Sequence, residues 1–257
     1  MSRFGNLELG GESESQFEQS ELVKDEVYYL SEARAMFEAG NFEQALRFYS
    51  KVLEFNPQNA VAWTAQVRML IELGEFREAK LWADKALERF PREPELLAAK
   101  AVALARNGDL QGALAFSDAS IEERGDTPYI WLARGDVMLA RKEHRADYCF
   151  EKALLLAPKD WFIAWLAARV RFYYGQFVLA LKLFQQAIEW NATNFLLWLE
   201  LGQCQQAMGL IGMAENSFTQ ALQLNPQCRE ADIRLLKISQ SGFWLRLRDW
   251  WRRLFNA

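Results

Sequence analysis

The stretch GNFEQALRFYSKVLEFNP, residues 40–57, occurs in related form five more times along the chain. It holds a turn glycine, an alanine five residues later, an aromatic residue four positions after that, and a proline at its end. The equivalent alanines are separated by 34, 34, 33, 34 and 34 residues: Ala45, Ala79, Ala113, Ala146, Ala180 and Ala214. A period of this length indicates a repeat protein whose unit is one helical hairpin.

The residue types within each period indicate two helices that cross closely. A small side chain such as Ala45 lets the helices approach, and an aromatic side chain such as Tyr49 or Phe218 fills the space beside the crossing. The proline after the second helix ends it, because its ring cannot donate the next hydrogen bond. Since one hairpin cannot bury this apolar surface alone, the pattern predicts a stack of hairpins.

The pattern resembles the tetratricopeptide repeat family. The resemblance covers six copies, residues 26–59, 60–93, 94–127, 128–160, 161–194 and 195–228. It implies an all-α fold, a right-handed superhelical solenoid of six hairpins. We predict that residues 229–241 form a helix that caps the stack. Repeat four is one residue short, and the loss lies between Trp131 and Ala146, where the turn glycine is missing.

In the resembling family, the first helices of the repeats line a concave inner surface that holds extended peptides. Repeat five has the densest aromatic run, and an alignment on Gly175 places Ala168 at its helix crossing. The alternative, that its aromatic side chains pack against neighbouring repeats, stays open. Partner contacts are predicted for Arg34, Arg68, Tyr129, Phe162, Trp165, Arg169, Phe172 and Tyr173.

The charges at one equivalent position of the first helices bear on the kind of partner. Arg34, Arg68 and Arg169 share this position in repeats one, two and five, and they favour a protein or peptide partner that is acidic and partly apolar. The row is interrupted in the other three repeats by Val102, Asp136 and Gln203.

Family members that act as chaperone adaptors hold a terminal carboxylate with lysine, asparagine and arginine side chains from their first three repeats. Only one of the matching positions here is basic: Leu30, Arg34, Ala65, Glu95 and Ala99. We therefore predict no appreciable affinity for the acidic tails of chaperones.

The two ends of the chain differ from the repeats. Residues 1–25 are acidic and poor in apolar side chains, which predicts a disordered tail. Residues 242–257 are rich in tryptophan and arginine and predict an amphipathic helix. Three roles stay open for this helix: docking on a membrane surface, docking on a partner, or capping the stack itself. Its apolar face would consist of Phe243, Trp244, Leu247, Trp250, Trp251, Leu254 and Phe255.

The composition argues against several classes of function. With 51% hydrophobic residues and a net charge of −4, the 257-residue chain has no general basic field for nucleic acid. Its three cysteines form no CxxC pair, so we expect no metal and no cofactor. The chain has one histidine and no phosphate-binding loop, so we expect neither catalysis nor a small-molecule substrate.

No signal peptide and no membrane-spanning run are evident, which predicts a cytoplasmic protein, with membrane association through the C-terminal helix as an alternative. The sequence thus predicts a non-catalytic interaction scaffold or adaptor. The second possibility is an accessory or regulatory subunit of an enzyme or membrane complex, anchored through its C-terminal helix.

Overall fold

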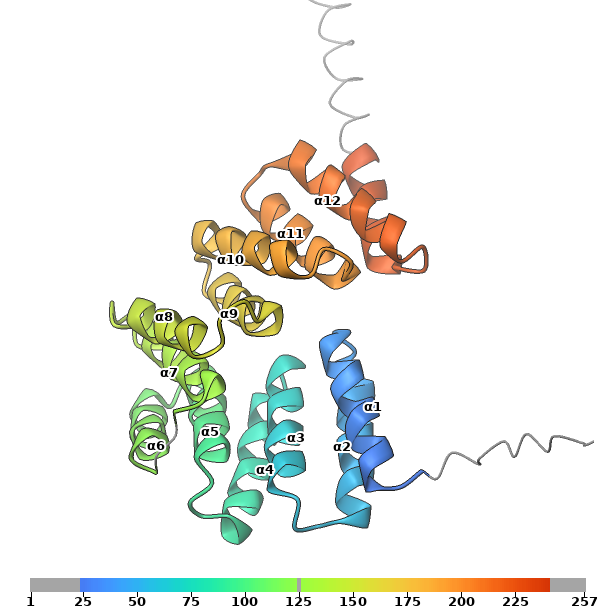
Figure 1. Ribbon diagram of the computed structural model, residues 1–257. Helices are drawn as coiled ribbons and strands as arrows, with labels where there is room; N and C mark the ends of the chain where they lie inside the picture. The colour runs from blue at the N-terminus through green and yellow to red at the C-terminus, as the bar shows by residue number, and fades with distance from the viewer. Residues whose placement is uncertain (1–23, 124–125, 241–257) are drawn as a thin grey trace, which may run out of the picture.

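The computed structural model describes residues 24–123 and 126–240, and every regular element in these ranges is a helix (Figure 1). The first six are α1 (Glu26–Glu38), α2 (Phe42–Phe55), α3 (Ala60–Glu72), α4 (Phe76–Arg89), α5 (Pro94–Arg106) and α6 (Leu110–Glu122). The next six are α7 (Pro128–Ala140), α8 (Ala146–Leu156), α9 (Trp161–Tyr173), α10 (Phe177–Trp190), α11 (Phe195–Ala207) and α12 (Ile211–Leu224). Residues 229–240 are also helical. The predicted all-α helical-repeat solenoid is confirmed for the described residues.

Both predicted terminal segments fall largely or wholly outside these ranges. The acidic tail over 1–25 is described only from residue 24, and the predicted C-terminal helix over 242–257 is not among the described residues. The predictions made for them, including the apolar face from Phe243 to Phe255, stay predictions.

Each hairpin turns at a residue in the left-handed region of φ. Five of these residues are glycines, with φ between 73° and 95°. In repeat four Lys142 takes this place with φ 58°. The missing residue also shortens the second helix there: α10 begins at Phe177, three residues before Ala180, whereas α8 begins at Ala146 itself.

Replacing Lys142 by glycine is expected to raise the free energy of unfolding by about 1 kcal/mol, because a side chain at positive φ is strained and glycine is not. The measurement is urea denaturation followed by circular dichroism. Lys152→Gly, inside α8, is the control and is expected to lower stability by about 1 kcal/mol. A loss of stability in both variants would contradict the strain at Lys142.

Two of the helix crossings pair a glycine with a phenylalanine. A Cβ atom on Gly135 of α7 would lie 2.8 Å from the ring of Phe150, and one on Gly202 of α11 would lie 2.6 Å from the ring of Phe218. Both rings are at most 1% exposed. The aromatic side chains predicted to fill the crossings therefore do so, and in these two repeats they leave no room for a methyl group opposite.

Replacing Gly202 by alanine is expected to lower the free energy of unfolding by about 1–2 kcal/mol. The overpacking against Phe218 outweighs the gain of up to about 1 kcal/mol that alanine gives in a helix. Gly212→Ala in α12 is the matched control, since no atom lies within 4 Å of the added Cβ. It should unfold at the same or a higher temperature, and equal losses in both variants would rule out the packing argument.

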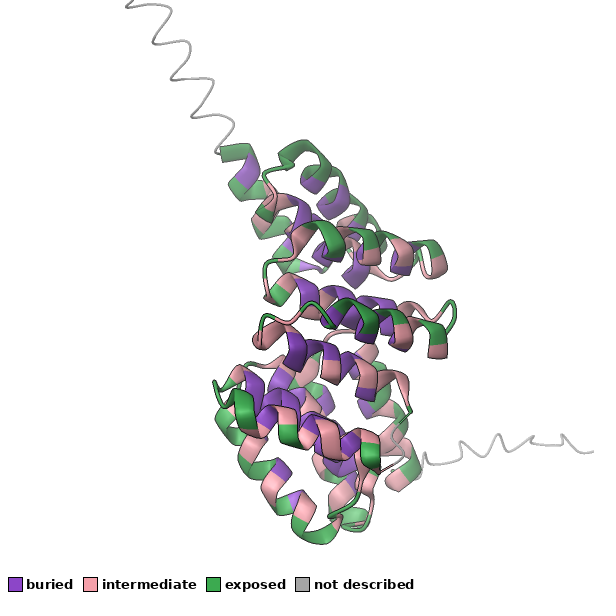
Figure 2. Ribbon diagram, turned by 90° about the vertical axis from the view of Figure 1, so that its left-hand side faces the viewer, coloured by how far each residue is buried: buried purple, intermediate pink, exposed green. Residues whose placement is uncertain are grey.

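Buried residues lie on the sides of the helices that face each other, and the exposed residues face outward (Figure 2). The superhelix also brings repeat one against repeat five, although repeats two, three and four lie between them in sequence. The ring of Phe37 in α1 lies 5.0 Å from that of Phe162 in α9, and Phe42 stacks at 6.4 Å on Trp165. A Cβ atom on Gly40 would lie 2.7 Å from Leu196 in α11. The inner surface is therefore enclosed by contacts across the superhelix axis.

Candidate functional site

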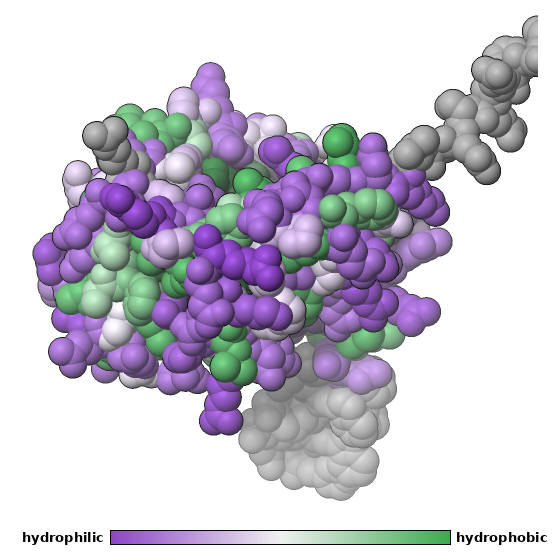
Figure 3. Space-filling view, turned by 90° about the horizontal axis from the view of Figure 1, so that it is seen from below, coloured by the Kyte–Doolittle hydropathy of each residue, from purple (hydrophilic) through white to green (hydrophobic). Residues whose placement is uncertain are grey.

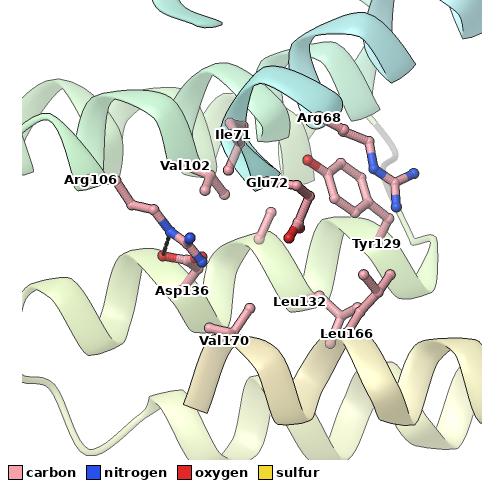
Figure 4. A pocket seen from close by; sticks show the side chains of 11 residues that line it. Arg68, Ile71, Glu72, Val102, Arg106, Tyr129, Leu132, Asp136, Leu166 and Val170 are labelled. Carbon is pink, nitrogen blue, oxygen red and sulfur yellow. Dashed lines mark hydrogen bonds and ion pairs between the residues drawn. The ribbon is translucent and has the colours of Figure 1, made fainter. Parts of the chain in front are cut away.

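The inner surface contains two cavities, which lie along the first helices of the repeats. Cavity A has a volume of about 240 Å³, and Arg34, Phe37, Tyr49, Thr64, Arg68 and Phe162 contribute to its wall. Cavity B has a volume of about 530 Å³, and Glu72, Phe76, Arg106, Arg169, Tyr173 and Glu200 contribute to its wall. A small hollow that includes Arg68, Glu72, Tyr129 and Asp136 lies along the same surface (Figure 4).

In cavity A the side chain of Arg68 packs against aromatic rings. The guanidinium of Arg68 lies 3.7 Å from the ring centre of Tyr129 and 5.1 Å from that of Phe37. Figure 4 shows Arg68 beside the ring of Tyr129. Burial raises the pKa of Tyr129 and of Tyr49, although Arg68 acts in the opposite direction on both. Both phenols therefore stay protonated at neutral pH, and Arg68 carries the positive charge beside them.

In cavity B one guanidinium bridges two carboxylates. Arg169 donates to Glu72 Oε2 from Nη2 at 2.7 Å and from Nε at 3.1 Å, and from Nη1 to Glu200 Oε1. Trp165 Nε1 donates to the other oxygen of Glu200 at 2.6 Å. These contacts join α3, α9 and α11, and so link repeat two directly to repeats five and six.

The two carboxylates of this cluster differ in their electrostatics. Burial raises the pKa of Glu72, but Arg169 and Arg106 outweigh it, so the pKa lies below its ordinary value. Burial also raises the pKa of Glu200, and there Arg169 and the hydrogen bond from Trp165 do not compensate fully, so the pKa lies above its ordinary value. Arg169 thus holds Glu72 in the charged form.

A second buried ion pair lies beside the first. Arg106 Nη2 donates to Asp136 Oδ2 at 2.6 Å, with 8% and 2% of the two side chains exposed (Figure 4). Tyr174 Oη donates to Asp136 Oδ1 at 2.7 Å. Tyr173 lies with its ring centre 4.1 Å from the Arg106 guanidinium. Both oxygens of Asp136 are therefore satisfied without solvent.

The structure distributes the eight predicted partner-contact residues over this surface. Arg34, Arg68 and Phe162 line cavity A, and Arg169, Phe172 and Tyr173 line cavity B. Tyr129 packs on Arg68. Trp165, however, is 0% exposed, because it packs against Phe42 across the axis and donates to Glu200. Trp165 therefore offers no surface to a partner. This agrees with the alternative interpretation, in which the side chain packs between repeats.

The basic row is largely neutralised. Arg34 pairs with Glu38 at 3.0 Å, and Arg169 pairs with Glu72 and Glu200. These three carboxylates belong to the site but were not predicted from the sequence. A signal was present, since Glu38 and Glu72 each follow an arginine of the row by four residues, which places them on the same helix face.

Several large apolar side chains are exposed, among them Leu81, Leu155 and Val178. Figure 3 shows one face, on which hydrophobic areas are divided by hydrophilic residues. None of the helices in the described ranges is both long enough and apolar enough to span a bilayer. Nor do three potential metal-ligating side chains come together among the residues that the structure covers.

Comparison with known proteins identifies the repeats in two segments. Models of the tetratricopeptide repeat match residues 36–103 and 196–228. These two segments are tetratricopeptide repeats. No curated protein matches the chain.

Solved structures share the fold of this chain. It is similar to TTC0263, a thermophilic TPR protein of Thermus thermophilus, with 22% identity, a TM-score of 0.54, and coverage of 70% of this chain and 99% of that one. It is also similar to a chain of the APC/C hetero-tetramer Cut9–Hcn1, with 16% identity and a TM-score of 0.52. That match covers 83% of this chain, which spans 43% of the length of the other.

Proposed function

We propose that this chain is a non-catalytic interaction scaffold that holds a segment of a partner protein on its inner surface. One observation carries the proposal: six of the eight residues that the sequence assigns to partner contact line cavity A or cavity B. The tetratricopeptide-repeat fold supports it, and a chain of similar fold belongs to a hetero-tetramer.

The partner segment is acidic and partly apolar in this proposal. Because Arg34 and Arg169 already have carboxylate partners, the acidic group of the segment is directed to Arg68. Apolar groups of the segment lie against Phe37 and Phe162 in cavity A, and against Tyr173 in cavity B. Aromatic and arginine side chains of this kind commonly dominate the energetics of interfaces.

Affinity capture with the full chain, followed by mass spectrometry, tests the proposal. The inner-surface variant carries Arg34→Glu and Tyr173→Asp, since the Arg34 side chain is 79% exposed and Tyr173 is 50% exposed. The matched control carries Arg77→Glu in α4 and Tyr148→Asp in α8, both exposed residues of second helices.

We expect the control to recover the same partner as the unmodified chain and the inner-surface variant to recover at least about tenfold less, a change of about 1.4 kcal/mol in binding. Circular dichroism should show equal helix content in both variants. Equal recovery by both would contradict binding at the inner surface. Peptides from the captured partner, with glutamate exchanged for glutamine, then test its acidic character.

A further inference from the structure

The wall of cavity A includes a residue whose hydroxyl is buried and has no hydrogen-bond partner. Thr64 of α3 is 4% exposed, and its Oγ1 has no partner among the described residues although the side chain lines the cavity. Buried hydroxyls in folded proteins are generally hydrogen-bonded, because an unpaired one destabilises the fold. Because this oxygen has almost no accessible surface in the isolated chain, an acceptor bound in the cavity reaches it only when the wall shifts slightly.

A guanidinium without a carboxylate lies one helical turn further along. Arg68 follows Thr64 by four residues, so both side chains lie on the same face of α3. Its guanidinium packs on the rings of Tyr129 and Phe37, and within the described part of the chain it forms no hydrogen bond or ion pair with a carboxylate. The rings restrict its orientation, while the N–H groups at its edge keep their capacity to donate.

The charges of the wall select the kind of acceptor. Glu38 and Glu95 also line cavity A, where Glu38 accepts from Arg34 and Glu95 accepts from Thr127. Two arginines and two glutamates line the cavity, and Arg68 is the one of these two arginines without a carboxylate partner among the described residues. A phosphate group, with close to two negative charges at neutral pH, would be repelled more strongly by Glu95. A carboxylate, with one negative charge, fits the charges of this wall better than a phosphate group does.

The size and the apolar walls of the cavity restrict the occupant further. Its volume of about 240 Å³ lies below the roughly 300–1,000 Å³ of typical small-molecule pockets. Phe37, Phe162 and Val61 provide apolar contact surface beside the two donors. The cavity therefore suits one acidic side chain and an adjacent apolar group of a longer chain.

We propose that cavity A is an anchor site for an aspartate or glutamate side chain of the partner, whose carboxylate accepts hydrogen bonds from Arg68 and from Thr64 Oγ1. This rests on the proposed function and adds a specific recognition site to it. The acidic residue lies within the partner segment, next to an apolar residue. Neither donor occupies one of the positions at which chaperone-adaptor members of the family hold a terminal carboxylate.

A titration with 3-phenylpropionate, which combines a carboxylate with a phenyl ring, tests the site in the full chain. Binding is followed by the amide chemical shifts of α3 in nuclear magnetic resonance spectra. 3-Phenylpropionamide is the neutral control ligand. We expect the acid to bind with saturation and the amide to bind at least about tenfold more weakly, because the amide loses the charge-assisted hydrogen bonds.

Two variants probe the donors. Arg68→Met keeps the packing between the rings and should weaken binding of the acid by about tenfold or more, whereas Thr64→Val removes the hydroxyl and should weaken it by about threefold to tenfold. Thr219→Val in α12 is the matched control, since the Thr219 hydroxyl donates to Glu215 O outside the site. This variant should bind the acid with the same affinity as the unmodified chain.

Thr64→Val should also unfold at a higher temperature than the unmodified chain when no ligand is present, because the unpaired hydroxyl is gone. Weaker binding together with a higher unfolding temperature supports the site. The proposal is overturned by equal affinity for acid and amide, by unchanged affinity in both Arg68→Met and Thr64→Val, or by the absence of saturable binding. The titration needs no partner protein, so its outcome is independent of the capture experiment.

Discussion

Replacing Arg169 by methionine is expected to lower the free energy of unfolding by about 3–5 kcal/mol at neutral pH, the usual cost of leaving a buried charge unpaired. The variant removes the shared partner of Glu72 and Glu200, whose side chains are 18% and 11% exposed. Urea denaturation followed by circular dichroism measures the loss. Arg34→Met, which removes an exposed arginine, is the control and should change stability by less than about 0.5 kcal/mol.

The loss of stability caused by Arg169→Met should depend on pH. In the unmodified chain the pKa of Glu72 is depressed, so its contribution to stability is present above the unfolded pKa and is lost as pH falls through the folded pKa. In the variant, the loss of Arg169 raises the pKa of both carboxylates relative to the unmodified chain, and burial keeps that of Glu200 above its ordinary value. Stability is then highest below their unfolded pKa and declines as pH rises through the folded values.

The difference between the two proteins should therefore shrink as pH is lowered from neutral toward about pH 5, where glutamates of raised pKa take up protons. A triple variant with Arg169→Met, Glu72→Gln and Glu200→Gln should recover most of the lost stability. A deficit that is independent of pH and is not recovered would contradict the role of Arg169 as a buried counter-ion.

Replacing Asp136 by leucine is expected to cost about 3–5 kcal/mol, because Arg106 would remain buried without a counter-ion. Burial acts to lower the pKa of Arg106, but the attraction of Asp136 outweighs it and raises the pKa, so Arg106 stays charged at any accessible pH. In the variant this attraction is gone, but lowering the pH still brings no relief, because a lower pH favours the charged form of arginine. Chemical denaturation at neutral and mildly acidic pH should show similar losses.

A compensated variant separates the ion pair from other effects of the substitution. Arg106→Met, Asp136→Leu and Tyr174→Phe together remove the cation, the anion and the hydroxyl that donates to Asp136. Buried ion pairs replaced by apolar groups of similar volume are often neutral in stability. We expect the triple variant to lie within about 1 kcal/mol of the unmodified chain. A triple variant as unstable as Asp136→Leu alone would show that a leucine side chain cannot be packed at this position.

The local part of the fold was predictable from the sequence because it repeats. The spacing of Ala45 and its equivalents predicted the hairpins, and the shortened repeat four was located between Trp131 and Ala146, where the structure has Lys142 at positive φ. The alignment on Gly175 placed Ala168 at the crossing, and the structure buries Ala168 completely. Each of these conclusions depends on neighbours within one or two hairpins.

The site was predictable only in part, for a physical reason. The contacts of Phe37 with Phe162 and of Glu72 with Arg169 depend on the rotation between successive repeats, and small rotations add up along a solenoid. No local pattern specifies that sum. The sequence therefore identified the side chains of the inner surface but not the contacts across it, and it assigned Trp165 to a partner where the structure packs it inside.

The contacts across the axis affect how the molecule unfolds. In an open solenoid each repeat touches only its neighbours, so terminal repeats fray and unfolding spreads from an end. Here α1 cannot detach without losing the contact between Phe37 and Phe162, and α3 cannot detach without breaking the link between Glu72 and Arg169. These pairs raise the contact order, so we expect them to slow folding and to couple the distant repeats into one cooperative unit. In hydrogen exchange, the amides of α1 and α9 should therefore open together.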